Sequence, residues 1–147
     1  MTHTATIDIQ FRDIVPDVLL AIDSLIQAGW SLARADQAAI WYLPLGGDDY
    51  DWHDTDIADW SKVRALIVEK TRRQETVGLI LSRNGSEANY LFFPDRRQLR
   101  IDINSAGHKC LSSQARWTDF GWYVSEVVYA LERDIGIIES VTCMDFP

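Results

Sequence analysis

The sequence of 147 residues has few cysteines, few basic residues and no long apolar run. With only Cys110 and Cys143, the chain cannot build a disulfide framework, and we expect two buried, reduced thiols. No apolar stretch approaches the roughly 18–20 residues of a membrane span, and the first residues do not have the pattern of a signal peptide. These absences predict a cytoplasmic protein that does not bind membranes.

Basic residues are scarce, with 14 Lys and Arg against 22 Asp and Glu, and the formal net charge is −8. Because affinity for phosphate backbones is built from Lys and Arg, this balance argues against direct binding of DNA or RNA. It favours a basic protein as the partner. The sequence also lacks the G-x-S-x-G, H-E-x-x-H, P-loop and dinucleotide-binding motifs. We therefore expect no enzymatic activity and no cofactor.

The pattern of apolar residues predicts one α+β domain spanning residues 1–147, in which about three helices pack on an antiparallel sheet. The expected order is β-α-ββ-α-βββ-α-β. Period-two and helical spacings predict these elements: strands at Ala5–Arg12, Ser31–Ala35, Ala38–Leu43 and Ile137–Cys143; helices at residues 16–28, 56–73 and 119–135; and a three-strand meander over Thr76–Asn104.

Turn and cap residues place the ends of these elements. Asn84–Gly85 favours a type I′ hairpin turn inside the meander, because both positions tolerate positive φ angles. Pro16 is expected in the first helical position, and Thr118 as the N-cap of the last helix. Gly29 predicts a left-handed cap at the end of the first helix. A further short strand is expected at Lys109–Ser112.

One short stretch, Asp48–Asp59, carries six aspartates and no Lys or Arg, and we call it the acidic segment. It accounts for most of the net charge and is expected to form a loop that leads into the second helix. Asp56 and Asp59 fall in the first turn of that helix, where negative charge suits the macrodipole. The other four aspartates have no such explanation. Within the helix, the spacing predicts that Ile57, Trp60, Val63 and Ile67 face inward, with Leu66 a weaker candidate.

Three interpretations of the acidic segment compete. His53 and the carboxylates of Asp48–Asp56 could hold a divalent cation in a small metal-dependent hydrolase. However, the segment lacks the glycine and terminal glutamate of an EF-hand, so no metal is expected. Aromatics among the carboxylates favour the second interpretation, a protein interface, in which Tyr50 and Trp52 anchor a basic partner. The third is a structural or regulatory module with a solvated acidic loop.

The last helix offers a second candidate surface. Its apolar residues Phe120, Val124, Val127, Val128, Leu131 and Ile135 form one stripe. Trp122 and Tyr129 fall almost opposite that stripe, with Glu126 beside them. Aromatic residues on an outer helix face predict a partner surface, and the same surface would serve a weak homodimer.

Two phrases, YLPLGGDDYDW and TDFGWYV, together with the layout of the whole chain, resemble small bacterial immunity proteins. Those proteins neutralise toxins of contact-dependent growth inhibition and related polymorphic systems. The resemblance implies a non-enzymatic inhibitor that binds the C-terminal domain of a toxin, and it assigns no residue a role. Charge and aromatic placement alone select the candidate partner-binding residues: Asp48, Asp49, Tyr50, Asp51, Trp52, His53, Asp54, Trp122, Glu126 and Tyr129.

Overall fold

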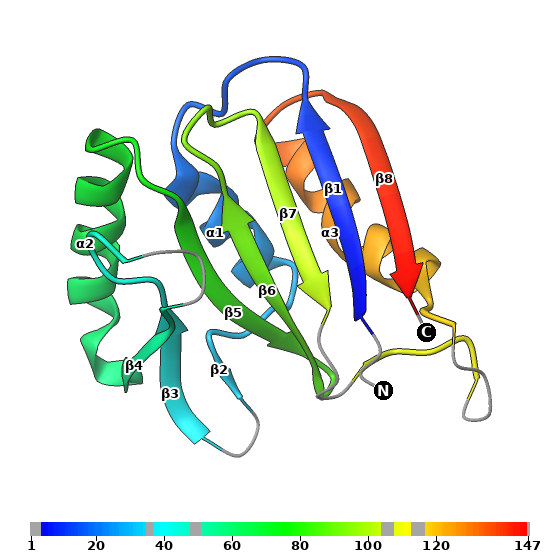
Figure 1. The fold of residues 1–147 in the computed structure, drawn as a ribbon, viewed down its shortest axis with the longest axis horizontal. Coiled ribbons are helices and arrows are strands. Elements are labelled where there is room, and N and C mark those ends of the chain that lie inside the picture. The colour runs from blue at the N-terminus through cyan, green and yellow to red at the C-terminus, as the bar shows by residue number, and fades with distance from the viewer. Residues whose placement is uncertain (1–3, 35–36, 48–50, 104–107, 113–116, 147) are drawn as a thin grey trace.

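The computed structural model describes residues 4–34, 37–47, 51–103, 108–112 and 117–146 (Figure 1). Its elements follow the order β-α-βββ-α-βββ-α-β, one strand more than the sequence predicted. They are β1 (Thr4–Phe11), α1 (Val18–Gln27), β2 (Ala33–Arg34), β3 (Gln37–Tyr42), β4 (His53–Asp56), the 3-10 turn η1 (Ile57–Asp59), α2 (Trp60–Arg72), β5 (Val77–Arg83), β6 (Ser86–Phe92), β7 (Gln98–Ile103), α3 (Phe120–Asp134) and β8 (Ile138–Phe146).

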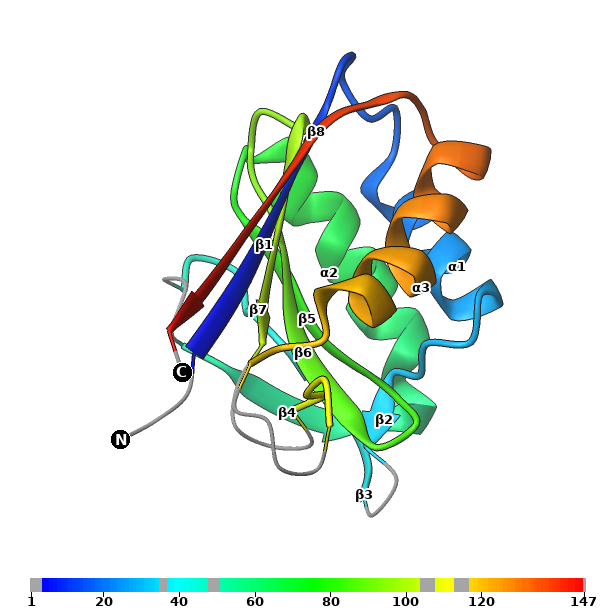
Figure 2. The same cartoon turned by 90° about the vertical axis from the view of Figure 1, so that its right-hand side faces the viewer.

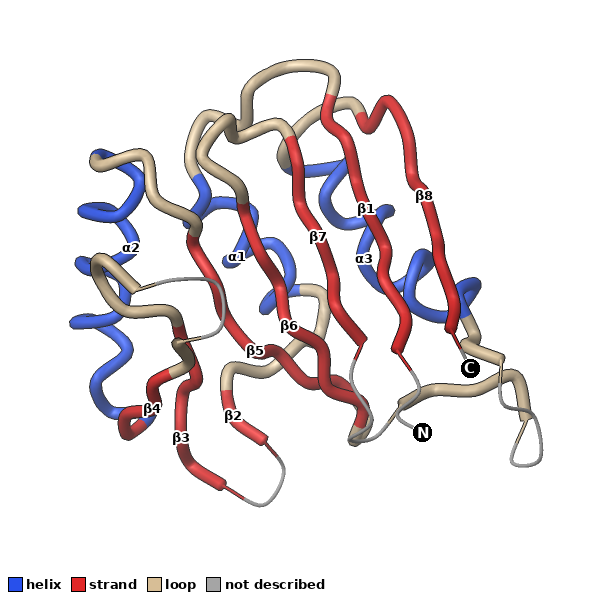
Figure 3. Tube along the Cα trace, viewed as in Figure 1, coloured by secondary structure: helices blue, strands red, loops and turns tan. Residues whose placement is uncertain are grey.

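The strands form one antiparallel sheet in the order β2-β3-β5-β6-β7-β1-β8, and β4 pairs with β3 outside this path (Figure 3). The three helices lie together on one side of the sheet, as the view along the sheet in Figure 2 shows. The predicted α+β fold with an antiparallel sheet is therefore confirmed. None of the helices that the structure describes is long and apolar enough to span a membrane.

The core lies between the sheet and the helices. In β1, the residues Ala5, Ile7, Ile9 and Phe11 are buried while their neighbours in sequence are not, as expected for a strand with one covered face. The helix α1 contributes a buried stripe: Val18, Leu19, Ala21, Ile22, Ser24 and Leu25. The opposite face of the sheet is uncovered over β1 and β7, where Thr6, Asp8, Gln98 and Arg100 are partly exposed.

The predicted meander is confirmed as β5, β6 and β7, paired in sequence order. Asn84 and Gly85 have φ angles of 51° and 80°, so both occupy the left-handed region that a type I′ turn requires. The loop between β2 and β3 joins two paired strands, as predicted, although Ala35 and Asp36 lie outside the described residues. Gly29 has a φ of 110° and forms the predicted left-handed cap.

The predicted starts of α1 and α3 were too early, because in both helices the capping side chain is an aspartate. Asp17, rather than the position before Pro16, caps α1 and accepts a hydrogen bond from the Leu19 N–H. Asp119 caps α3 through the Trp122 N–H. Thr118, the predicted cap, is instead buried and bonded to Asp145 in β8.

Three further expectations were wrong near the C-terminus. The last strand extends to Phe146 instead of ending at Cys143. Cys143 is exposed, because β8 is an edge strand with only β1 beside it; neither Cys143 nor Cys110 is disulfide-bonded. The strand expected at Lys109–Ser112 is reduced to a single bridge between Cys110 and Thr118.

Candidate functional site

The described part of the acidic segment is a strand and a tight helical turn, which corrects the prediction of a loop. Residues His53–Asp56 form β4 and pair antiparallel with β3, so that His53 lies opposite Tyr42. The helix α2 then begins at Trp60, four residues later than expected, because η1 comes first. Asp48, Asp49 and Tyr50 lie outside the described residues.

The carboxylates of β4 share one face. Residues directly opposed in antiparallel strands point to the same side, and Thr55 is paired with the fully buried Ile40. Thr55 therefore faces the helices, while Asp54 and Asp56 alternate to the other side and are exposed. Two residues apart in a strand, their side chains are separated by about 7 Å. The strand thus presents a short row of negative charge to solvent.

Asp51 and His53 lie together at the start of β4, and His53 faces the side opposite to Asp54 and Asp56. The Nε2 atom of His53 lies 3.2 Å from Oδ1 of Asp51, and each side chain is 51% exposed. The imidazole ring also meets the ring of Tyr42 edge-on, with centroids 6.3 Å apart. This corner of the sheet edge combines a carboxylate, an imidazole and a phenol ring, and the two rings face the same side as Ile40 and Thr55.

A buried lysine holds the chain that leads into the acidic segment. Lys70, in the last turn of α2, is 1% exposed, and its ammonium donates to the carbonyl oxygen of Pro44 at 2.7 Å. It also donates to Oε1 of Glu75 at 3.2 Å, and the same oxygen accepts from the Gly46 N–H at 2.8 Å. The Gly46 N–H and the Lys70 ammonium lower the pKa of Glu75 below its ordinary value. Pro44 and Gly46 are therefore fixed to the C-terminal end of α2.

Packing against the sheet provides a second anchor. Trp52 is half-buried and lies with Leu43 over Gly78 of β5, on the face of the sheet away from the helices. A methyl group at position 78 would come within 2.6 Å of Cδ1 of Leu43 and 3.0 Å of Cη2 of Trp52. Glycine is therefore required here for close approach. The partial exposure predicted for Trp52 agrees with its position.

A recess of about 120 Å³ separates the acidic segment from α2, lined by Tyr42, Thr55, Asp59, Lys62, Val63 and Leu66. The Thr55 hydroxyl donates to Asp59 at 2.7 Å, and the Lys62 ammonium lies 3.5 Å from the same carboxyl. These two contacts lower the pKa of Asp59. Pockets for small ligands span about 300–1,000 Å³, so this recess suits a single side chain of a partner.

The inward face of α2 differs from the prediction at Ile57. Val63 and Ile67 are buried as expected, whereas Ile57 is 41% exposed, because it belongs to η1 and not to the helix. Trp60 is half-buried against the core, with the guanidinium of Arg64 5.6 Å from its ring centroid. Trp60, Val63 and Ile67 therefore face inward as predicted, and Ile57 does not.

The three candidate residues of α3 do not form one exposed patch. Trp122 is half-buried and meets the ring of Trp30 at 5.9 Å. Glu126 pairs with Arg83 at 3.0 Å, so it links α3 to β5. Tyr129 alone is strongly exposed, at 73%. Trp122 was predicted to point outward because the predicted inner stripe of α3 was centred on a different side of the helix from the observed one.

The centre of the inner face of α3 contains two residues that the prediction omitted. Tyr123 and Ala130 are buried together with the predicted Val127 and Leu131, while the other predicted members of the stripe are half-buried. The stripe is therefore rotated toward Tyr123, which brings Trp122 to its border. Figures 1 and 2 place α3 behind the sheet near β1 and β8, and β4 at the other end of the sheet. The candidate residues that the structure describes thus belong to two separate surfaces.

The hypothesis of a metal-dependent hydrolase requires a set of metal ligands, and the described part of the chain contains none. No three His, Cys, Asp or Glu side chains lie close enough there to hold a metal ion. His53 and Asp51 are together, but Asp54 and Asp56 project from the other side of β4. Since Asp48 and Asp49 lie outside the described residues, the hydrolase stays a hypothesis.

Sequence reasoning missed Lys70 and Gly78, the two residues that support the acidic segment. A signal for Lys70 existed, because it follows Val63 and Ile67 at the spacing of one helix face. Lys70 was instead interpreted as a cation in the last turn of the helix, where positive charge suits the macrodipole. Nothing local marks Gly78, because the need for glycine comes from Trp52, far away in the sequence.

Comparison with known proteins returned no relative: no family model matches the chain, and neither a curated protein nor a solved structure resembles it significantly.

Proposed function

We propose that this chain is an immunity-type inhibitor: a non-enzymatic, cytoplasmic protein that binds the C-terminal domain of a cognate bacterial toxin. The acidic segment would cover a basic, nucleic-acid-binding surface of that domain. The observation that carries the proposal is the support given to exposed carboxylates. The buried Lys70, paired with Glu75, holds the chain that leads into the segment, and Trp52 within the segment packs over Gly78. A loop that served only solubility would need no such anchors.

Electrostatics favour a cationic partner. The exposed carboxylates of Asp51, Asp54 and Asp56 gather at one edge of a protein whose net charge is −8. Such a surface speeds encounter with a basic protein and disfavours acidic ones. The recess beside Tyr42 and Leu66 offers a place for one anchoring side chain of the partner.

The first test removes charge. Replacing Asp48, Asp49 and Asp51 together by Asn should slow association with the cognate toxin domain by on the order of tenfold at low salt. The salt dependence of the association rate should also flatten, because exposed charges act mainly on encounter. Stopped-flow or surface-based binding kinetics at two salt concentrations measure both effects.

A matched control removes three charges from other parts of the molecule: Asp13→Asn, Glu132→Gln and Glu139→Gln, all exposed. If only net charge matters, this variant will slow association as much as the first one. A local interface requires a clearly larger effect at the acidic segment.

The second test removes the aromatic anchor. Trp52→Ala should speed dissociation and cost on the order of 2 kcal/mol or more in affinity. Because Trp52 also covers Gly78, an unfolding curve must accompany the kinetics. Unchanged kinetics in both the Asp and the Trp variants, with folding intact, would show that the toxin binds elsewhere. Tyr129 on α3 would then be the first residue to replace.

A further inference from the structure

A groove of about 440 Å³ lies at the other end of α2, between the last turn of the helix and the turn that joins β6 to β7. We call it the arginine groove. Its lining residues are Val68, Thr71, Arg72, Gln74, Pro94 and Arg96. Three of them, Thr71, Pro94 and Arg96, also line a narrow cleft that continues inward.

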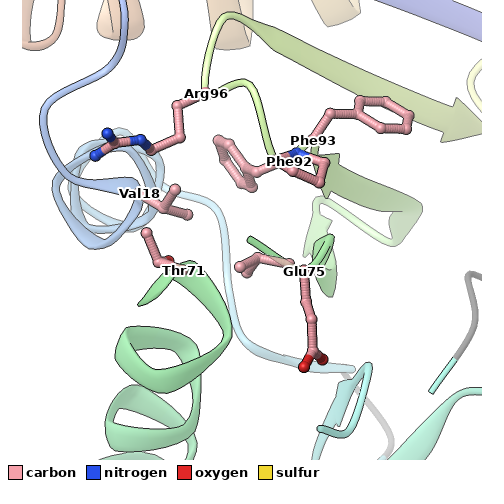
Figure 4. A pocket seen from close by; sticks show the side chains of 8 residues that line it. Val18, Thr71, Glu75, Phe92, Phe93 and Arg96 are labelled. Atoms are coloured by element: carbon pink, nitrogen blue, oxygen red, sulfur yellow. The ribbon is translucent and has the colours of Figure 1, made fainter. Parts of the chain in front are cut away.

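The inner cleft is narrow, with room for about one water molecule, roughly 10 Å³. Its walls are mixed, with apolar side chains such as Val18, Val77 and Phe92 beside Thr71 and Glu75. Figure 4 shows Val18 of α1 and Thr71 of α2 close together, with the ring of Phe92 from β6 beside them. Arg96 extends above Val18, at the outer side of the cleft (Figure 4). The arginine groove thus has arginine side chains at its outer border, which we call the rim, and continues inward to apolar side chains of α1 and β6.

The rim carries net positive charge in an acidic protein. Glu69 accepts hydrogen bonds from both Arg72 and Arg73, so one carboxylate serves two guanidinium groups. Glu75 lines the inner cleft, but Figure 4 shows its carboxylate turned away from Arg96. That carboxylate accepts a hydrogen bond from Lys70. The arginines of the rim therefore outnumber the carboxylates that face them.

Arg96 is placed to receive a ligand. Among the residues that the structure describes, its guanidinium has one hydrogen bond, a long one of 3.4 Å to the carbonyl oxygen of Pro16. The Arg96 backbone has a φ of 56°, and that of Gln74 across the rim has a φ of 57°. Each costs about 1 kcal/mol or more relative to glycine, so both walls carry long polar side chains at strained positions.

We propose that the arginine groove binds a small carboxylate that carries a short apolar group. The carboxylate pairs with the guanidinium group of Arg96, whose planar donors match its two oxygens. Arg72, which already donates to Glu69 through Nε and Nη2, adds positive charge nearby. The apolar group covers Val68 and Pro94 and reaches the mouth of the inner cleft. The narrowness of that cleft excludes long chains and rings. The proposal is independent of toxin binding, because the acidic segment lies at the opposite end of α2.

The probe is hexanoate, titrated into ¹⁵N-labelled protein and followed by the backbone amides of the groove and the Nε–H signals of Arg72 and Arg96. For a ligand of about eight non-hydrogen atoms, a Kd on the order of 1 mM is expected. N-acetyl-leucine, which mimics the C-terminus of a peptide, is titrated in parallel. Tighter binding of hexanoate would indicate a small metabolite as the natural ligand, and tighter binding of N-acetyl-leucine would indicate the C-terminus of a peptide. Hexanol and N-acetyl-leucinamide lack the charge and should not bind.

Two variants and one control complete the test. Arg96→Gln and Val68→Asp should each weaken hexanoate binding at least tenfold; Val68 is 56% exposed, so the new carboxylate does not disturb the core. Arg97→Gln is the matched control, because its guanidinium contacts the Arg12 carbonyl and lies 3.9 Å from Glu139. Absence of shifts at 20-fold the expected Kd would overturn the proposal. Equal affinity for hexanol, or for inorganic phosphate, would overturn it too.

Discussion

The two ends of α2 carry opposite charge and are built in opposite ways. The helix is about 20 Å long, with the acidic segment at its N-terminus and the arginine groove at its C-terminus. Each charge stabilises the helix end where it lies, through the macrodipole. The acidic segment is continuous in sequence, whereas the groove combines α2, α1 and the turn after β6.

The difference between these two regions shows where a surface gets its rigidity. The acidic segment needs anchors because like charges repel, and its anchors, Lys70 and Glu75, come from the far end of α2. The arginine groove needs none, since each wall belongs to a regular element or a tight turn. Glu75 belongs to both regions: it lines the inner cleft, and its carboxylate holds Gly46.

The largest effect should come from breaking the anchor of the acidic segment. Lys70→Met keeps the length of the side chain but removes the ammonium that donates to the Pro44 carbonyl, and it leaves the Glu75 carboxylate with the Gly46 N–H and without its cation. The free energy of unfolding should fall by about 2–3 kcal/mol, as is usual when one partner of a buried ion pair is removed. Urea unfolding measures the change, and the Gly46 amide signal should shift.

Lys62→Met is the matched control for this prediction, because its side chain is 82% exposed and only meets Asp59 at the surface. Its effect should stay within about 0.5 kcal/mol. Similar losses for both variants would mean that burial of Lys70 contributes nothing.

The next effect concerns the sheet beneath the acidic segment. Gly78→Ala forces Leu43 and Trp52 outward and should cost about 1–3 kcal/mol through overpacking. The Trp52 signals in NMR should move with it. Gly136→Ala is the control: no atom lies within 4 Å of the added methyl group, so stability should be unchanged or slightly higher. A neutral Gly78→Ala would show that Trp52 does not rest on β5.

At the other end of α2, a substitution should stabilise. Gln74→Gly relieves a φ of 57° just after the helix and should raise the free energy of unfolding by about 0.5–1 kcal/mol. The same change at Gln27, inside α1, should instead lower it by up to about 1 kcal/mol. Thermal and urea unfolding of Gln74→Gly and Gln27→Gly measure the two changes in stability. A lower free energy of unfolding for Gln74→Gly would contradict the inference that the backbone at Gln74 is strained.

The smallest effect is pH-dependent. Hydrogen bonds from Arg72 and Arg73 lower the pKa of Glu69 from 4.5 to about 2. A carboxyl whose pKa is lowered on folding stabilises the protein above its ordinary pKa, and that contribution is lost as the pH falls toward 2. Glu69→Gln should therefore melt slightly below the parent protein at pH 6 and converge with it near pH 2. A difference in melting temperature that stays constant between pH 6 and pH 2 would show that the lowered pKa of Glu69 does not contribute to stability.

Local patterns predicted much of the fold. The positive φ angles at Asn84 and Gly85 follow from residue type, and the alternation in β1 follows from burial of one face. Helix existence was predicted correctly, while helix starts shifted because aspartates competed with Pro16 and Thr118 for the cap. These are errors of a few residues within correctly identified elements.

Charge density, turn residues and apolar periodicity were determined by the sequence alone, because each depends on neighbours within a few positions. Tertiary structure decided the rest. The aspartates of β4 form a strand only because β3 offers an edge to pair with. Lys70 is buried because Pro44 and Glu75 satisfy its ammonium. The arginine groove and its inner cleft exist because residues 18, 68–74 and 94–96 converge on one end of a helix, and no local pattern encodes which distant groups will meet.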